Sequence, residues 1–220
     1  MIDLDPEKYK MDLESKKEDY WRKRGDKMVL NLFHLMAKRV PAYKNFLKKN
    51  GVRAEKIKNM ESLKSISPVD KNNYLRSYPL ENLCWDGDFK KKRWVISSTS
   101  GSTGEPFYFP REHSQDSQYS LLAELYLRTN FEIDKKSTLY IVAFPLGIWI
   151  GGLFTYQAIK LVAERGYNLS IITPGIDKNE VIRVVKKFGG MFDQVIIGCY
   201  GPFLKDIIDE GIRQGVAWKK

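Results

Sequence analysis

The chain has 220 residues, of which 43% are hydrophobic and 13% aromatic, and it carries a formal net charge of +10. This composition excludes a disordered chain, and it suffices for one large domain or two small ones. With two Cys and two His, a zinc site is not expected, whereas the charge favours anionic partners such as nucleotides, coenzyme A, nucleic acid or acidic lipid.

The N-terminal part, residues 1–75, is predicted to be a helical, highly charged segment that covers the next one. Its first residues are acidic and lack the basic and apolar regions of a signal peptide, so we expect a cytoplasmic protein. Apolar residues at helical spacing predict a helix over Tyr20–Val40, which Pro41 ends. A second helix is expected over Ala42–Lys49, because Asn50-Gly51 is a typical helix end.

Two short strands, Arg93–Ile96 and Phe107–Phe109, are predicted to form a hairpin with a long loop. Nine loop residues, Ser98–Pro106, contain five Ser or Thr and two Gly. Glycine lets backbone N–H groups approach an anion, and hydroxyl groups add short donors, so the loop suits nucleotide phosphates. Composition alone leaves a flexible Ser/Gly linker equally open.

From residue 114 onward, helices alternate with strands, which predicts βαβ units and a mostly parallel sheet in residues 76–220, hence a mixed α/β fold. The apolar run over residues 139–154 is too short for a membrane helix, and no membrane partner is expected. On the predicted helix Ser114–Asn130, we expect Leu121, Leu122, Leu125 and Tyr126 to lie on one apolar face. The predicted helices are Ser114–Asn130, Trp149–Arg165, Asp177–Phe188 and Pro202–Gln214, and the predicted strands are Ser137–Phe144, Asn168–Ile172 and Gln194–Gly198.

The loop order Thr99-Ser100-Gly101-Ser102-Thr103-Gly104-x-Pro106 resembles the phosphate-loop signature TSG[ST]TGxP of the adenylate-forming superfamily. Its flanks, Val40–Tyr43, Ser67–Lys71 and Phe144–Gly152, resemble phenylacetate–CoA ligases and their capsule-biosynthesis relatives. The resemblance extends from about residue 20 to the last residue. It implies an incomplete adenylate-forming N-terminal domain with a hairpin phosphate loop.

The resemblance implies an AMP-forming ligase that uses ATP and Mg²⁺ to convert a carboxylic acid to an acyl-adenylate and pyrophosphate. Coenzyme A then takes the acyl group as a thioester, and AMP leaves. It places the ATP phosphates on Ser98, Thr99, Ser100, Gly101, Ser102, Thr103 and Gly104. It places the acid, an aryl or arylacetic acid by its aromatic walls, among Phe144, Trp149, Gly151, Gly152 and Tyr200. No catalytic residue is assigned. Without the resemblance, ordinary core packing is the favoured interpretation of Phe144 and Trp149.

Two features depart from the family pattern. Glu105 stands where a lysine often lies in or beside the loop, so we expect Glu105 to point away from phosphate; Lys90–Arg93 could supply charge, but a solvated strand edge is the favoured interpretation. The later motifs, a Mg²⁺-associated glutamate, a ribose-binding aspartate and a C-terminal domain with its lysine, have no counterpart. We therefore expect an N-terminal portion that is inactive alone, needs the C-terminal portion in cis or trans, and self-associates through exposed apolar surface.

Two other functions remain open. A non-catalytic nucleotide- or acyl-binding accessory protein of polysaccharide biosynthesis would bind ATP without any dependence on a partner. A nucleic-acid-binding protein would explain the charge, but no helix-turn-helix, zinc-finger or RNA-recognition signature is present, so no nucleic-acid partner is expected. Steeply salt-dependent binding to DNA or RNA would favour that third function.

Overall fold

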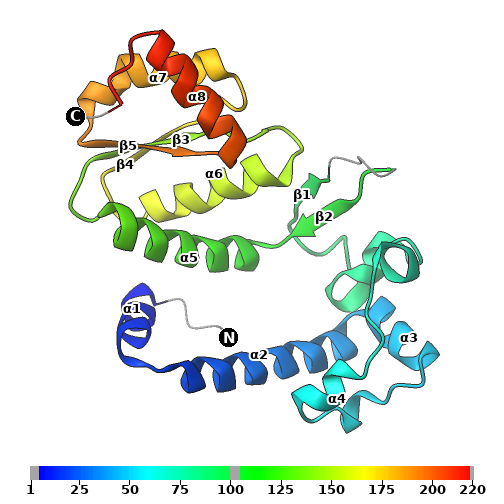
Figure 1. The fold of residues 1–220 in the computed structure, drawn as a ribbon. Coiled ribbons are helices and arrows are strands. Elements are labelled where there is room, and N and C mark those ends of the chain that lie inside the picture. Colours follow the sequence, from blue (N-terminus) through cyan, green and yellow to red (C-terminus); the bar gives the residue numbers. More distant parts are fainter. Residues whose placement is uncertain (1–4, 100–104, 219–220) are drawn as a thin grey trace. The chain divides into compact units, whose positions relative to one another are not determined.

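A computed structural model of the chain describes residues 5–99 and 105–218 (Figure 1). Contacts divide the chain into two compact units. The helical unit is Met11–Arg93, and the sheet unit combines Met1–Lys10 with Trp94–Lys220. The division falls within helix α1 (Pro6–Ser15).

The helical unit is built on two helices that meet at Val40, α2 (Glu18–Arg39) and α3 (Pro41–Lys49). Pro41 lies in the first turn of α3, and Val40 has extended backbone because proline disfavours helical conformation in the residue before it. Both predicted helices are confirmed to within two residues. Shorter elements complete the unit: η1 (Ala54–Lys56), α4 (Met60–Lys64), the π turn η2 (Lys71–Leu75), η3 (Leu80–Leu83) and η4 (Trp85–Gly87).

The helical unit extends to Arg93, whereas the sequence placed the division at residue 75. Residues of η3 and η4 account for the difference, because Leu83 and Trp85 pack on the buried cluster of Val40, Ala42, Phe46 and Tyr74. In addition, Arg39 at the end of α2 donates two hydrogen bonds, of 3.0 and 2.6 Å, to the carboxylate of Asp86. Such long-range packing leaves no local mark in the sequence.

The sheet unit contains a hairpin and a three-stranded parallel sheet. Strands β1 (Val95–Ser98) and β2 (Tyr108–Arg111) pair antiparallel, as predicted. The parallel sheet has the order β4-β3-β5, so β3 is central. Its strands are β3 (Thr138–Val142), β4 (Leu169–Ile172) and β5 (Gln194–Gly198), and its helices are α5 (His113–Phe131), α6 (Ile150–Ala163), α7 (Lys178–Phe188) and α8 (Gly201–Arg213). A 3₁₀ turn, η5 (Gly189–Met191), follows α7.

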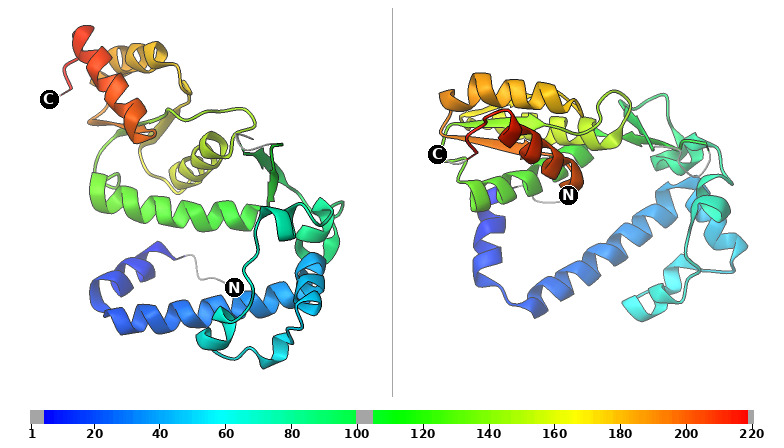
Figure 2. Two further views of the ribbon diagram at one scale, coloured as in Figure 1. Left: turned by 45° about the vertical axis from the view of Figure 1, so that its right-hand side comes forward. Right: turned by 45° about the horizontal axis from the view of Figure 1, so that its top comes forward.

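Helices cover both faces of this sheet, with α5 and α6 on one side and α7 and α8 on the other (Figures 1 and 2). Every residue of β3 is buried, and its side chains alternate between the two faces. Tyr140 and Val142 join the core against α5 and α6, while Leu139 and Ile141 join the core against α7 and α8. The mixed α/β class and the parallel sheet are therefore confirmed.

Within the described residues, no helix is both long and apolar enough to cross a membrane.

Candidate functional site

The carboxyl end of the parallel sheet is where a ligand is expected to bind. Strand β3 continues into α6 on one face and β5 continues into α8 on the other, so the chain diverges between these neighbouring strands. In sheets of this kind, the crevice outside such a switch point holds the ligand. The strands stay paired to their ends, where the Ala143 N–H donates to the Gly198 carbonyl at 2.8 Å. Phe144 lies just after β3, and Tyr200 lies just after β5.

The Ser/Thr-rich loop begins beside this switch point. The N–H of Ser98, at the end of β1, donates to the carbonyl of Ile148 in the segment after β3, at 2.9 Å. Thr99 closes the neck of the loop, because its N–H donates to the Phe107 carbonyl and its Oγ1 accepts from the Phe107 N–H, both at 3.0 Å. The described members of the predicted phosphate site, Ser98 and Thr99, therefore hold the neck.

The remaining predicted phosphate ligands lie outside the described residues. They are Ser100, Gly101, Ser102, Thr103 and Gly104. The role predicted for them stays a prediction.

A buried ion pair anchors the hairpin to α5. Arg111 ends β2 with 5% of its surface exposed, and its Nε donates to Asp116, which is 2% exposed, at 3.3 Å. Its Nη1 donates to the Ser97 hydroxyl at 2.8 Å, and its guanidinium lies 4.5 Å from the ring centre of Phe154 on α6. Its Nη2 is buried without a hydrogen-bond partner among the described residues. Sequence reasoning missed Arg111, because its partners are brought to it only by folding.

The predicted acid-pocket residues after β3 fall into different environments. Phe144 is half-buried, whereas Trp149 is 36% exposed and forms a parallel bridge with Ser98. Gly151 is exposed, and Gly152 is buried where the Pro145 carbonyl oxygen would lie 2.1 Å from an added Cβ. The missing side chain at Gly152 thus makes room for the turn itself. Tyr200, at the start of α8, is 63% exposed.

An apolar cavity of about 370 Å³ runs beneath β5 toward the same end of the sheet. Phe144 lines it, but the other four predicted acid-pocket residues, all described, do not. Sequence reasoning missed most of its wall, although Tyr119, Leu122 and Tyr126 recur at helical spacing on α5. Of the four residues predicted to form one apolar face of this helix, Leu121 and Leu125 are buried, whereas Leu122 and Tyr126 are 61% and 59% exposed. The principal side chains that line the cavity are Tyr119, Leu122, Tyr126, Tyr140, Phe144 and Cys199.

Three tyrosines with raised pKa values predict how the stability of the fold changes at high pH. Burial raises the pKa of Tyr74, Tyr140 and Tyr167 to about 12, from an ordinary value of 10. Because these phenols ionise more readily in the unfolded chain, their stabilising contribution is complete below pH 10 and is lost as the pH rises from 10 through about 12. Urea unfolding at stepped pH should therefore show a smaller alkaline loss in Tyr140→Phe. The exposed control, Tyr200→Phe, should behave like the parent; equal losses in both variants would contradict the prediction.

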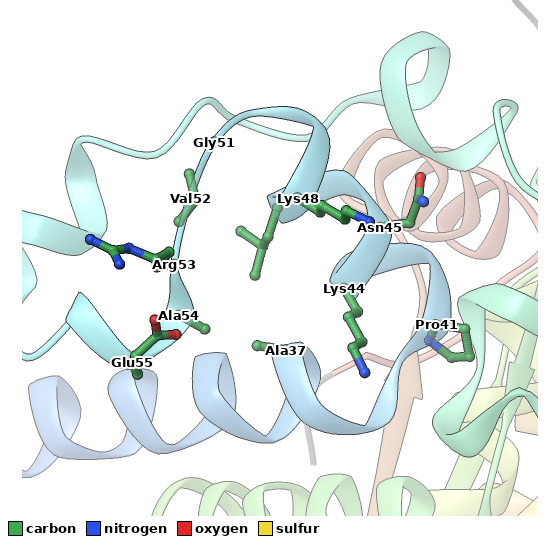
Figure 3. Close-up of a pocket in the computed structure, with 11 residues that line it drawn as sticks. Ala37, Pro41, Lys44, Asn45, Lys48, Gly51, Val52, Arg53, Ala54 and Glu55 are labelled. Atoms are coloured by element: carbon green, nitrogen blue, oxygen red, sulfur yellow. The ribbon is translucent and has the colours of Figure 1, made fainter.

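A second hollow, of about 720 Å³, lies in the helical unit between α2, α3 and the segment 51–55 (Figure 3). Its wall includes Leu47 and Val52, with Lys44, Lys48 and Arg53 around it. The three cationic side chains point in different directions, so they do not converge on one anion (Figure 3). This hollow contains none of the predicted site residues and suggests no chemistry.

The described residues contain no group of three or more His, Cys, Asp or Glu side chains arranged to hold a metal ion. No protein-family model matches the chain. A search of curated proteins likewise found no match.

Proposed function

We propose that the chain supplies the ATP-phosphate and acid sites of an AMP-forming acid–CoA ligase. The observation that carries this proposal is the hydrogen bond from the Ser98 N–H to the Ile148 carbonyl. It tethers the neck of a loop rich in hydroxyl groups and glycine to the segment that follows β3. Sheets with this connectivity bind ligands at that end, so the neck of the loop, Ser98 and Thr99, lies near the place where a nucleotide would bind in this proposal.

In this proposal the loop acts by aiming hydrogen-bond donors at phosphate. The hydroxyl groups of Ser100, Ser102 and Thr103 and the amides of Gly101 and Gly104 would bind the β- and γ-phosphates. Donors fixed in this way stabilise the charge on departing pyrophosphate by about 2–4 kcal/mol each. Glu105 is exposed, consistent with a carboxylate that avoids the phosphates.

The acid would enter from the apolar cavity, where Phe144 meets the carboxyl ends of β3 and β5. Tyr119, Tyr126 and Tyr140 surround that cavity with aromatic rings, which favours an aromatic acid over a short polar one. Mg²⁺ would balance the phosphate charge, and coenzyme A would accept the acyl group.

Binding of ATP and of pyrophosphate tests the loop directly. We expect Ser102→Ala/Thr103→Ala to weaken the binding of both ligands about tenfold or more, because two donors to phosphate are lost. Titration calorimetry on the intact chain measures this. The matched control, Ser65→Ala/Ser67→Ala, removes two exposed hydroxyl groups from the helical unit and should leave affinity unchanged. Equal affinities in both double variants would show that the loop does not bind the phosphates.

Isotope exchange between ATP and pyrophosphate then tests catalysis. We expect exchange in a mixture of the chain, a C-terminal portion of an adenylate-forming ligase and an acid substrate. ATP binding without exchange in a folded mixture would favour the non-catalytic accessory function instead.

A further inference from the structure

The net positive charge of the protein lies in the helical unit. Residues 11–93 contain 21 Lys or Arg against 11 Asp or Glu, a net charge of +10. The remaining residues contain 16 of each and are neutral overall. The proposed nucleotide and acid sites lie in the neutral unit and do not use this net positive charge. The charge therefore points to a separate, anionic partner.

The side chains of helix α2 form three stripes along its length. Leu30, Phe33 and Ala37 face the unit's own core, where Phe33 is 4% exposed. Trp21, Met28, Leu32 and Leu35 recur at helical spacing on a second stripe. Of these, Met28, Leu32 and Leu35 are 42–50% exposed, and the neighbouring Val29 is 43% exposed. Exposed apolar side chains thus form a stripe along the longest helix.

The third stripe is polar and basic. Exposed side chains follow the same spacing along it. They are Lys23, Lys27, Asn31, His34 and Lys38. Helices α3 and α4 lie around the C-terminal half of α2 (Figures 1 and 2), and the end of α1 contacts its first turns, where Tyr20 and Arg24 donate to Asp12. The helix therefore presents an apolar stripe and a basic stripe side by side.

We propose that the helical unit docks on the surface of an anionic lipid bilayer, with α2 lying in the interface. Such a helix inserts its apolar stripe at the level of the acyl chains and keeps its basic stripe among the headgroups. Each lysine near an anionic surface contributes electrostatic attraction, and the net charge of +10 on the helical unit supplies it. Nucleic acid would use the charge but gains little from Met28, Leu32 and Leu35, because phosphate contacts and base stacking involve no aliphatic stripe.

This docking needs no membrane-spanning helix. It departs from the expectation that the protein has no membrane partner, which considered only the length of the apolar run and the missing signal peptide.

Co-sedimentation of the full chain with vesicles tests the proposal. We expect binding to vesicles that contain phosphatidylserine and much weaker binding to pure phosphatidylcholine. Leu32→Gln/Leu35→Gln should weaken binding about tenfold or more, because apolar surface no longer enters the interface. Lys23→Gln/Lys27→Gln should weaken it about fivefold for each lysine removed.

Matched variants of the sheet unit serve as controls. Leu122→Gln/Tyr126→Gln removes two apolar side chains that are 61% and 59% exposed, and Lys186→Gln/Lys187→Gln removes two exposed charges. Neither pair should change vesicle binding. Brominated acyl chains should quench tryptophan fluorescence in the parent and in Trp149→Phe, and quench it less in Trp21→Phe.

Three results would overturn the proposal. The first is equal binding to neutral and anionic vesicles, or binding to neither. The second is an equal effect of the α2 variants and the sheet-unit variants. The third is salt-dependent binding to DNA or RNA that is tighter than vesicle binding and unchanged in Leu32→Gln/Leu35→Gln, which would assign the charge to nucleic acid.

Discussion

Replacing Arg111 by methionine is expected to destabilise the sheet unit by about 3–5 kcal/mol, because it leaves the charge of Asp116 buried without its partner. Both side chains are almost fully enclosed, and Arg111 also holds Ser97 and the ring of Phe154. The hairpin that carries the loop should loosen with the loss. Urea unfolding measures the stability, and ATP titration reports on the loop.

The double variant Arg111→Met/Asp116→Leu separates the two causes. Removing both charges eliminates the uncompensated carboxylate, so the double variant should be more stable than Arg111→Met alone. Arg183→Met breaks the exposed pair with Glu180 in the same unit and should change stability little. If the double variant lost as much stability as the two single variants together, the buried pair would not be the anchor.

Substitution of Gly152 by alanine should have the second large effect. An added Cβ would lie 2.1 Å from the Pro145 carbonyl oxygen and 2.8 Å from its carbonyl carbon. These are backbone atoms, so the turn after β3 must move, at a cost of about 1–3 kcal/mol. Because this turn carries Ile148, which accepts the hydrogen bond from Ser98, ATP affinity should fall as well.

The neighbouring glycine is a matched control. At Gly151 an added Cβ would meet only Phe144 Cδ1, at 4.0 Å, which is ordinary contact. Alanine is the better helix former by about 1 kcal/mol, so Gly151→Ala should be neutral or stabilising. Thermal unfolding of both variants gives the comparison; equal destabilisation would show that the close approach to Pro145 is not the cause.

Regular elements were predicted well because their signals are local. Strand β5 has the predicted limits, Gln194–Gly198, and helix α5 differs by one residue at each end. Apolar runs bounded by glycine or proline, and apolar residues at helical spacing, reflect backbone geometry that each segment imposes on itself. The hairpin was predicted for the same reason.

Features that depend on distant partners were not predictable in this way. Leu122 and Tyr126 share a helical face with apolar neighbours, but whether that face is covered depends on what the fold brings to it. The helical unit ends at Arg93 and not at residue 75, because Trp85 and Asp86 contact residues of α2 and α3. Periodicity shows that a side chain is apolar and on which side of its helix it lies, and it says nothing of the neighbour.

The sequence by itself determined the strands, the helices α2, α3 and α5 to α8, the α/β class, the hairpin and the composition of the loop, since each is written in consecutive residues. Only the tertiary structure decided where the neck of that loop is tethered, that Arg111 and Asp116 pair beneath it, and that the positive charge and an open apolar stripe share one unit. The physical reason is that burial and charge pairing are properties of two surfaces in contact, whereas a run of residues specifies only one of them.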